Sequence, residues 1–212
     1  MLLGLGLTIV GGGITWANFA LKDDEGYYTT KTLHIDKEDS YAIVSVPADI
    51  HLGSVWVWDW SDLVSFKVEG SNDNSSKDIF IGVAQESDIN GYLQNVSYDE
   101  VIGFDINPDK LEYRHHSGNL TPVAPINETF WKYSANGSGT QTLYWELETG
   151  RWVFAVMNAD GSQDVDVSVR VGAKVPWLFP TGLGLLIGGI VVLTAGPLMI
   201  FMAVRRPRGP TK

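Results

Sequence analysis

Histidines and carboxylates are the side chains of this sequence that could do chemistry, because the chain has no cysteine. The four histidines are His34, His51, His115 and His116. The adjacent His115 and His116 could join a carboxylate in a metal site, but neighbouring residues on a strand point to opposite faces. We therefore expect no metal and no cofactor, and we interpret the pair as solvent-exposed loop residues.

Recognisable catalytic motifs are absent from the sequence. It contains no Gly-x-Ser-x-Gly elbow, no Gly-Lys-Ser/Thr phosphate loop and no His-Glu-x-x-His helix. The stretch 158–161 is similar to part of a calcium loop, but it puts Val156 and Val167 where such a loop requires carboxylates. We expect a hairpin turn there, and a protein that is not an enzyme. The alternative is an enzyme site formed by carboxylates and histidines without a known spacing.

Three tryptophans form a candidate ligand-binding surface. Residues 55–60 alternate as a strand does, which places Trp56, Trp58 and Trp60 on one face, about 7 Å apart. Indoles in such a row could stack on sugars or on an aromatic partner. The alternative, which we favour, is that they form one side of a sandwich core.

Five Asn-x-Ser/Thr sequons are candidate glycosylation sites. With the asparagine, serine and threonine content of this chain, chance predicts about 1.3 such sequons, and all five lie between residues 22 and 176. Acceptors of this kind are typical of the exported part of a protein. The asparagines are Asn74, Asn95, Asn119, Asn127 and Asn136.

Two apolar segments delimit the part of the chain that carries these residues. Residues 178–204 hold no charged side chain and are followed by a basic tail, residues 205–212. About 20 apolar residues cross a bilayer, and basic residues beside a span are retained in the cytoplasm. We therefore expect a transmembrane helix over 177–204. Residues 1–21 are also uncharged and predict a transmembrane signal anchor, with a cleaved signal peptide as the alternative. Both termini would then be cytoplasmic.

The charge of the middle segment limits its partners. Residues 22–174 hold all 25 acidic residues and 11 of the 15 basic ones, a formal charge of −14. Such a surface excludes nucleic acid, which requires a basic footprint, and disfavours anionic lipid headgroups. With no cysteine and an acidic surface, the segment would suit an archaeal cell surface.

Short strands with frequent turns predict the fold of residues 22–176. Residues 79–84 and 152–157 are apolar on both faces, as central strands are. Val165, Val167 and Val169 alternate with polar residues, so we expect them to point into a core. We interpret residues 143–171 as a three-stranded meander. Residues 87–95 predict the one short helix, capped by Ser87.

The fold class that follows is an all-β extracytoplasmic sandwich, jelly-roll-like, with one short helix and two flanking transmembrane α-helices. Its domains are a signal anchor at 1–21, a sandwich at 22–176, a transmembrane helix at 177–204 and a tail at 205–212. Glycines in both apolar segments, Gly184 and Gly188 among them, favour a close pair of helices.

Several sequence runs in the outer domain carry a family resemblance. They are the run 79–84, followed by Asp88-Ile89 and Tyr92-Leu93, then Trp131 with residues 139–145, and finally residues 150–162. These runs resemble an uncharacterised family of membrane-anchored surface proteins from bacteria and archaea. The resemblance implies the same layout with two anchors, and it brings no established activity.

These observations favour a membrane-anchored binding, interaction or structural module of the cell envelope. Its partners would be the lipid bilayer and either envelope glycans or another membrane protein, with no nucleic acid. The alternative is an accessory subunit of a membrane transport complex, or the enzyme described above.

Overall fold

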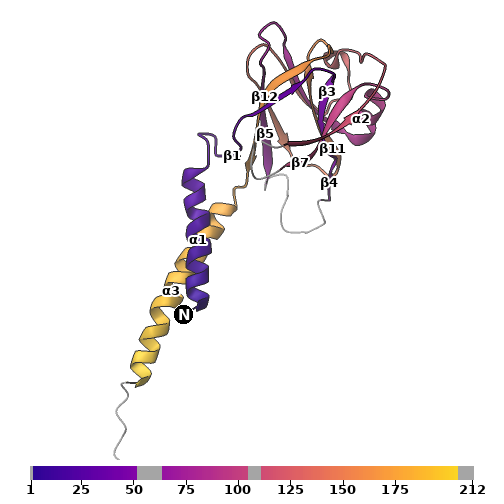
Figure 1. Cartoon of the computed structure of the whole chain (residues 1–212). Helices are drawn as coiled ribbons and strands as arrows, with labels where there is room; N and C mark the ends of the chain where they lie inside the picture. The colour runs from indigo at the N-terminus through magenta and orange to yellow at the C-terminus, as the bar shows by residue number, and fades with distance from the viewer. Residues whose placement is uncertain (1, 52–63, 105–110, 205–212) are drawn as a thin grey trace, which may run out of the picture. The chain divides into compact units, whose positions relative to one another are not determined.

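The computed structural model describes residues 2–51, 64–104 and 111–204 (Figure 1), which divide into two compact units. One unit comprises residues 1–26 and 175–212 and contains the helices α1 (Leu2–Ala20) and α3 (Leu178–Val204). The other unit, Tyr27–Lys174, is built mostly of strands. Both helices are long and apolar enough to cross a lipid bilayer.

The helices α1 and α3 run antiparallel and pack closely through glycines. A Cβ atom on Gly11 would lie 2.7 Å from the carbonyl oxygen of Gly182, and one on Gly189 would lie 2.6 Å from the backbone nitrogen of Thr8. The predicted helix pair is therefore present. Of the glycines expected to make this contact, Gly4 and Gly11 do so, whereas a Cβ atom on Gly184 or Gly188 would meet no described atom within 4 Å.

The second unit is a sandwich of two sheets, which we call sheet A and sheet B. Sheet A runs in the order β1-β12-β5-β10, and β2 also pairs with β12. Every pair in it is antiparallel. Its strands are β1 (Tyr28–Thr29), β2 (Leu33–Lys37), β5 (Ser65–Asn72), β10 (Gln141–Glu146) and β12 (Val165–Lys174).

Sheet B has seven strands in the order β8-β7-β3-β11-β6-β9, and β4 also pairs with β11. Strands β3 and β7 are parallel, and the other pairs are antiparallel. The strands are β3 (Ala42–Ser45), β4 (Ala48–Ile50), β6 (Ile79–Gln85), β7 (Tyr98–Phe104), β8 (Leu111–His116), β9 (Tyr133–Gly137) and β11 (Gly150–Asn158).

The core lies between the two sheets, with a second apolar layer outside sheet B. On β12, Val165, Val167 and Val169 are buried and pack with β6 and β11, as the alternation predicted. Strands β6 and β11 are buried on both faces because α2 (Glu86–Tyr92) and the loop around Trp131 cover the outer face of sheet B. The prediction of two central strands is therefore confirmed.

The predicted meander over residues 143–171 is wrong. Its three strands are present, but β10 and β12 belong to sheet A and β11 belongs to sheet B. The turn at 158–161 therefore joins the two sheets and is not a hairpin turn. The physical reason is that β11 is apolar on both faces, so it is buried best in the middle of the sheet that α2 covers.

The short helix starts one residue earlier than expected. Its N-cap is Gln85, which makes no side-chain cap hydrogen bond, and Ser87 lies inside the first turn. The predicted Ser87 cap is therefore wrong. Glu86 and Asp88 supply negative charge at this end, where the helix dipole favours it. A 3₁₀ turn, η2 (Pro125–Asn127), follows later in the chain.

Candidate functional site

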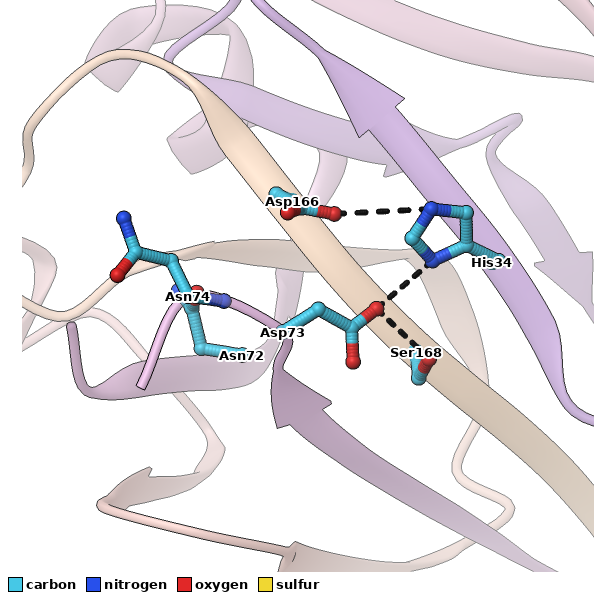
Figure 2. A network of polar contacts seen from close by, with 6 residues as sticks. All are labelled: His34, Asn72, Asp73, Asn74, Asp166 and Ser168. Atoms are coloured by element: carbon cyan, nitrogen blue, oxygen red, sulfur yellow. Dashed lines mark hydrogen bonds and ion pairs between the residues drawn. The ribbon is translucent and has the colours of Figure 1, made fainter. Parts of the chain in front are cut away.

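A polar cluster on the outer face of sheet A brings together residues that are far apart in the sequence (Figure 2). His34 comes from β2, Asp73 follows β5, and Asp166 and Ser168 come from β12. The strand register pairs His34 with Ser168, and the backbone N–H of Asp73 donates to the carbonyl of Asp166 at 2.9 Å. Strand pairing therefore holds all four side chains on one side of the sheet.

The imidazole of His34 lies between the two carboxylates of this cluster. Its Nδ1 atom is 2.7 Å from Asp73 Oδ2, and its Nε2 atom is 3.8 Å from Asp166 Oδ1. Asp166 Oδ1 is buried and has no hydrogen-bond partner among the described residues. A doubly protonated imidazole would therefore present an N–H group to both carboxylates.

This cluster suits binding better than catalysis. The Ser168 hydroxyl donates to Asp73 Oδ2 at 2.8 Å, so it hydrogen-bonds a carboxylate and has no histidine nitrogen as a base. One nitrogen and two carboxylate oxygens lie within 4.8 Å of one another, a spacing that a metal ion could bridge. The side chains of His34, Asp73 and Asp166 are 63%, 30% and 37% exposed, so solvent competes for any ligand there.

A shallow hollow of about 160 Å³ adjoins the cluster on the same face of sheet A. Polar side chains of β5 and β12 line it, and Ser168 belongs to both the hollow and the cluster. Arg170 donates to the Thr32 hydroxyl at 3.1 Å and lies 3.7 Å from Glu69. The hollow therefore offers donors and acceptors in fixed positions to a polar ligand.

A second polar network lies where β7 meets β8. Asp99 is buried and accepts a hydrogen bond from the Ser40 hydroxyl, while His115 Nδ1 is 3.4 Å from the same carboxylate oxygen. Ser97 Oγ is 3.4 Å from His115 Nε2, which gives the connectivity of a serine–histidine–aspartate relay. The Ser97 hydroxyl, however, donates its proton to the Asp39 carbonyl at 2.7 Å. This proton is therefore directed at the Asp39 carbonyl and away from His115.

The interpretation of His115 and His116 as loop residues is wrong. Both lie on strand β8, where His115 pairs with Asp99 of β7 and His116 pairs with Tyr98. His116 Nε2 is 3.1 Å from Glu100 Oε2, and its ring stacks on Tyr98 at 4.3 Å. The two rings therefore contact different carboxylates, as expected for adjacent residues of one strand. His51 is exposed and lies 3.2 Å from Asp49.

Tyr113 lies beside Asp99 on the same two strands. Burial and the negative charge of Asp99 raise the pKa of its phenol to about 12. The Lys37 ammonium lies 3.8 Å from the centre of its ring, in a cation–π contact. Tyr113 therefore stays neutral at pH 7, and it packs against the core between the sheets.

All five sequon asparagines are exposed, and they lie on separate parts of the sandwich. Their positions are the β5–β6 turn, the turn after α2, the loop after β8, the last residue of η2 and the edge strand β9. In the same order they are Asn74, Asn95, Asn119, Asn127 and Asn136. Oligosaccharides at these positions would meet no packed core, so glycosylation stays a prediction that the fold can accommodate.

The tryptophans Trp56, Trp58 and Trp60 lie outside the residues that the structure describes. Their assignment to the core or to a binding surface stays a prediction. Trp145 and Trp152 are buried between the sheets, and Trp131 packs on Phe80 at 4.9 Å outside sheet B.

An apolar cavity of about 270 Å³ lies between the two sheets. On each of four strands, one lining residue is buried and the lining residue two positions along is half-buried, always toward the same end of the sandwich. With the buried residue first, these pairs are Val169–Val171, Val68–Phe66, Val156–Phe154 and Ile43–Ser45. Within the described part of the chain, the cavity is therefore least covered at the end of the sandwich where β12 finishes.

Sequence reasoning missed both the cluster around His34 and the cavity. Residues 34, 73 and 166 carry no common motif, and only the pairing of β2, β5 and β12 brings them together. In the sequence, the residues that line the cavity have the same apolar pattern as ordinary buried strand residues. The sole signal was the alternation of polar residues on β12, which correctly placed Asp166 and Ser168 outside.

Comparison with known proteins gives no further indication of function. No family model matches the chain, and no curated protein matches it. The function is therefore inferred from the geometry described above.

Proposed function

We propose that this protein is a membrane-anchored binding module of the cell envelope, with residues 22–176 outside the cytoplasm. In this proposal α1 and α3 cross the bilayer and the basic tail, residues 205–212, stays in the cytoplasm. The pairing of β1 with β12 supports the proposal. Tyr28 lies opposite Ala173, so the chain enters and leaves the sandwich at adjacent positions. A domain inserted between two neighbouring helices requires its ends to be close together.

The observation that carries the binding function is the polar outer face of sheet A. This face holds the cluster around His34 and the adjoining hollow, whereas α2 packs on the opposite sheet. Its side chains are held by hydrogen bonds and ion pairs, including Ser168 to Asp73 and Arg170 to Thr32. Such prepositioned groups bind a polar partner without a large loss of side-chain entropy.

The partner class that this face fits best is a hydroxyl-rich glycan of the cell envelope. Carboxylate, hydroxyl and guanidinium groups hydrogen-bond to sugar hydroxyls, and the hollow of about 160 Å³ has room for part of a sugar ring. The acidic surface disfavours polyanionic partners. Another membrane protein with a complementary basic surface is the alternative partner.

Binding is favoured over catalysis because neither polar network has an activated nucleophile. Ser168 hydrogen-bonds a carboxylate, and the Ser97 proton is donated to a backbone carbonyl. An activated serine requires its proton to be directed at a base.

A glycan-array measurement with the full chain in lipid nanodiscs tests the proposal. We expect binding to envelope polysaccharide that falls roughly tenfold in Arg170→Gln, since a lost charged hydrogen bond costs about 1.5–3 kcal/mol. The matched control is Arg114→Gln, which removes another exposed, ion-paired arginine from strand β8. Equal affinity in the two variants would reject the outer face of sheet A as the binding surface.

A further inference from the structure

We propose that the apolar cavity between the sheets binds the hydrocarbon tail of a membrane lipid. Among the residues that the structure describes, those that line it are aliphatic or aromatic, apart from Ser45. The Ser45 hydroxyl oxygen already accepts the backbone N–H of Phe154 at 3.0 Å. A sugar, a peptide or an ion would lose its hydration there without gaining hydrogen bonds. The lining of the cavity therefore favours a hydrocarbon ligand over a polar one.

The volume of the cavity matches a single chain segment. An apolar cavity of ~150 Å³ stays free of water and takes up benzene, so about 270 Å³ has room for roughly ten carbons. The lining comes from both sheets, with Val68 and Val169 on one side and Ile81 and Val156 on the other. A tail entering between them would be surrounded by side chains, as in other apolar ligand sites.

The least covered end of the cavity favours a lipid as the source of this tail. Val171, on the half-buried rim, lies near the end of β12, and only residues 175–177 separate β12 from α3. A link of that length reaches at most about 14 Å. If α3 crosses the bilayer, the rim therefore stays within reach of the membrane surface. In this respect the inference rests on the proposed membrane anchoring.

Photolabelling of the full chain in nanodiscs tests the inference. The probe is a phosphatidylcholine with a diazirine at the end of one acyl tail, and labelled peptides are identified by mass spectrometry. We expect labelling of α3 and also of sandwich peptides that contain Phe66, Val101 or Leu111. Labelled α3 with unlabelled sandwich peptides would overturn the cavity proposal and leave the anchoring intact. An unlabelled α3 would instead contradict the proposed anchoring.

Two variants on the same strand sharpen the test. Val101→Phe adds a ring on the rim of the cavity, whereas Ile102→Phe adds one on the exposed side of β7. We expect sandwich labelling to fall roughly tenfold in Val101→Phe, because the ring takes volume that the tail requires, and to persist in Ile102→Phe. Labelling that is unchanged in Val101→Phe would overturn the proposal. Val171→Phe fills the cavity from the other sheet and serves the same purpose if Val101→Phe does not fold.

Discussion

The side chain of Asn158 connects the two sheets at the turn between β11 and β12. It is fully buried, its amide donates to the carbonyls of Ser162 and Gln163 at 3.0 Å, and its Oδ1 accepts from Asn72 at 2.7 Å. The Ser162 carbonyl has this amide as its donor, and the Gln163 carbonyl also accepts from the Lys77 ammonium at 2.7 Å. The chain can therefore leave sheet B and enter sheet A without leaving buried polar groups unpaired.

Replacing Asn158 with alanine should be strongly destabilising. Since it removes several hydrogen bonds from a fully buried position and leaves the Ser162 carbonyl without this donor, we expect a loss of about 2–4 kcal/mol in the free energy of unfolding. Thermal or denaturant unfolding of the full chain in detergent would measure it. Asn127→Ala, at an exposed asparagine, is the control and should change stability by less than about 0.5 kcal/mol. Similar losses in both variants would contradict the role assigned to Asn158.

Asp160 in the same turn makes stability depend on pH. Burial raises the pKa of its carboxyl, but hydrogen bonds from the Ser162 hydroxyl and backbone N–H outweigh this effect, so the pKa lies below its ordinary value. Such a carboxyl stabilises the fold above its unfolded pKa, about 4, and loses this contribution as pH falls through the folded pKa. We expect Asp160→Asn to melt below the wild type at pH 7. The difference should disappear near pH 2, and a difference of unchanged size there would refute this account.

At the scale of elements, close packing of α1 and α3 depends on particular glycines. Gly189→Leu would drive a side chain into the backbone of Thr8, whereas Gly184→Leu would point into open space. Helices packed through larger side chains lie about 8–10 Å apart, so we expect Gly189→Leu to move them apart by roughly 2 Å or more. Electron-spin distance measurements between labels at positions 2 and 199 would detect this. A matching shift in Gly184→Leu would contradict the glycine contact.

Local sequence patterns predicted the positions of the strands better than they predicted which strands pair with one another. The alternation on β12 and the double-sided burial of β6 and β11 depend on each strand alone, and both predictions were right. The meander was wrong because pairing is decided by segments far away, such as β5 for both β10 and β12. The helix pair was predicted from glycine content, but the contact face required the register between the two helices.

The candidate site was less predictable than the fold. The sequence identified His34 only as one of four histidines, and its neighbours Asp73 and Asp166 come from two other segments. In so acidic a chain, carboxylate pairs are common, and only strand register selects these two. The cavity was unpredictable for a related reason, since its volume depends on how far apart the two sheets pack.

For the whole molecule, two apolar helices and an acidic sandwich together suggest how the chain is used. The helices α1 and α3 would hold the sandwich at the membrane, and the outer face of sheet A would stay available to envelope partners. The acidic surface keeps the sandwich soluble and repels anionic lipid headgroups.

Cysteine labelling on intact cells tests the central claim of membrane anchoring most directly, because the chain has no cysteine of its own. Ser117→Cys places a thiol in the exposed loop after β8, and Lys212→Cys places one in the basic tail. We expect a membrane-impermeant maleimide to label the cysteine at position 117 on intact cells, and the one at position 212 only after the cells are opened. Labelling of position 212 alone on intact cells, or of neither position until lysis, would contradict the account.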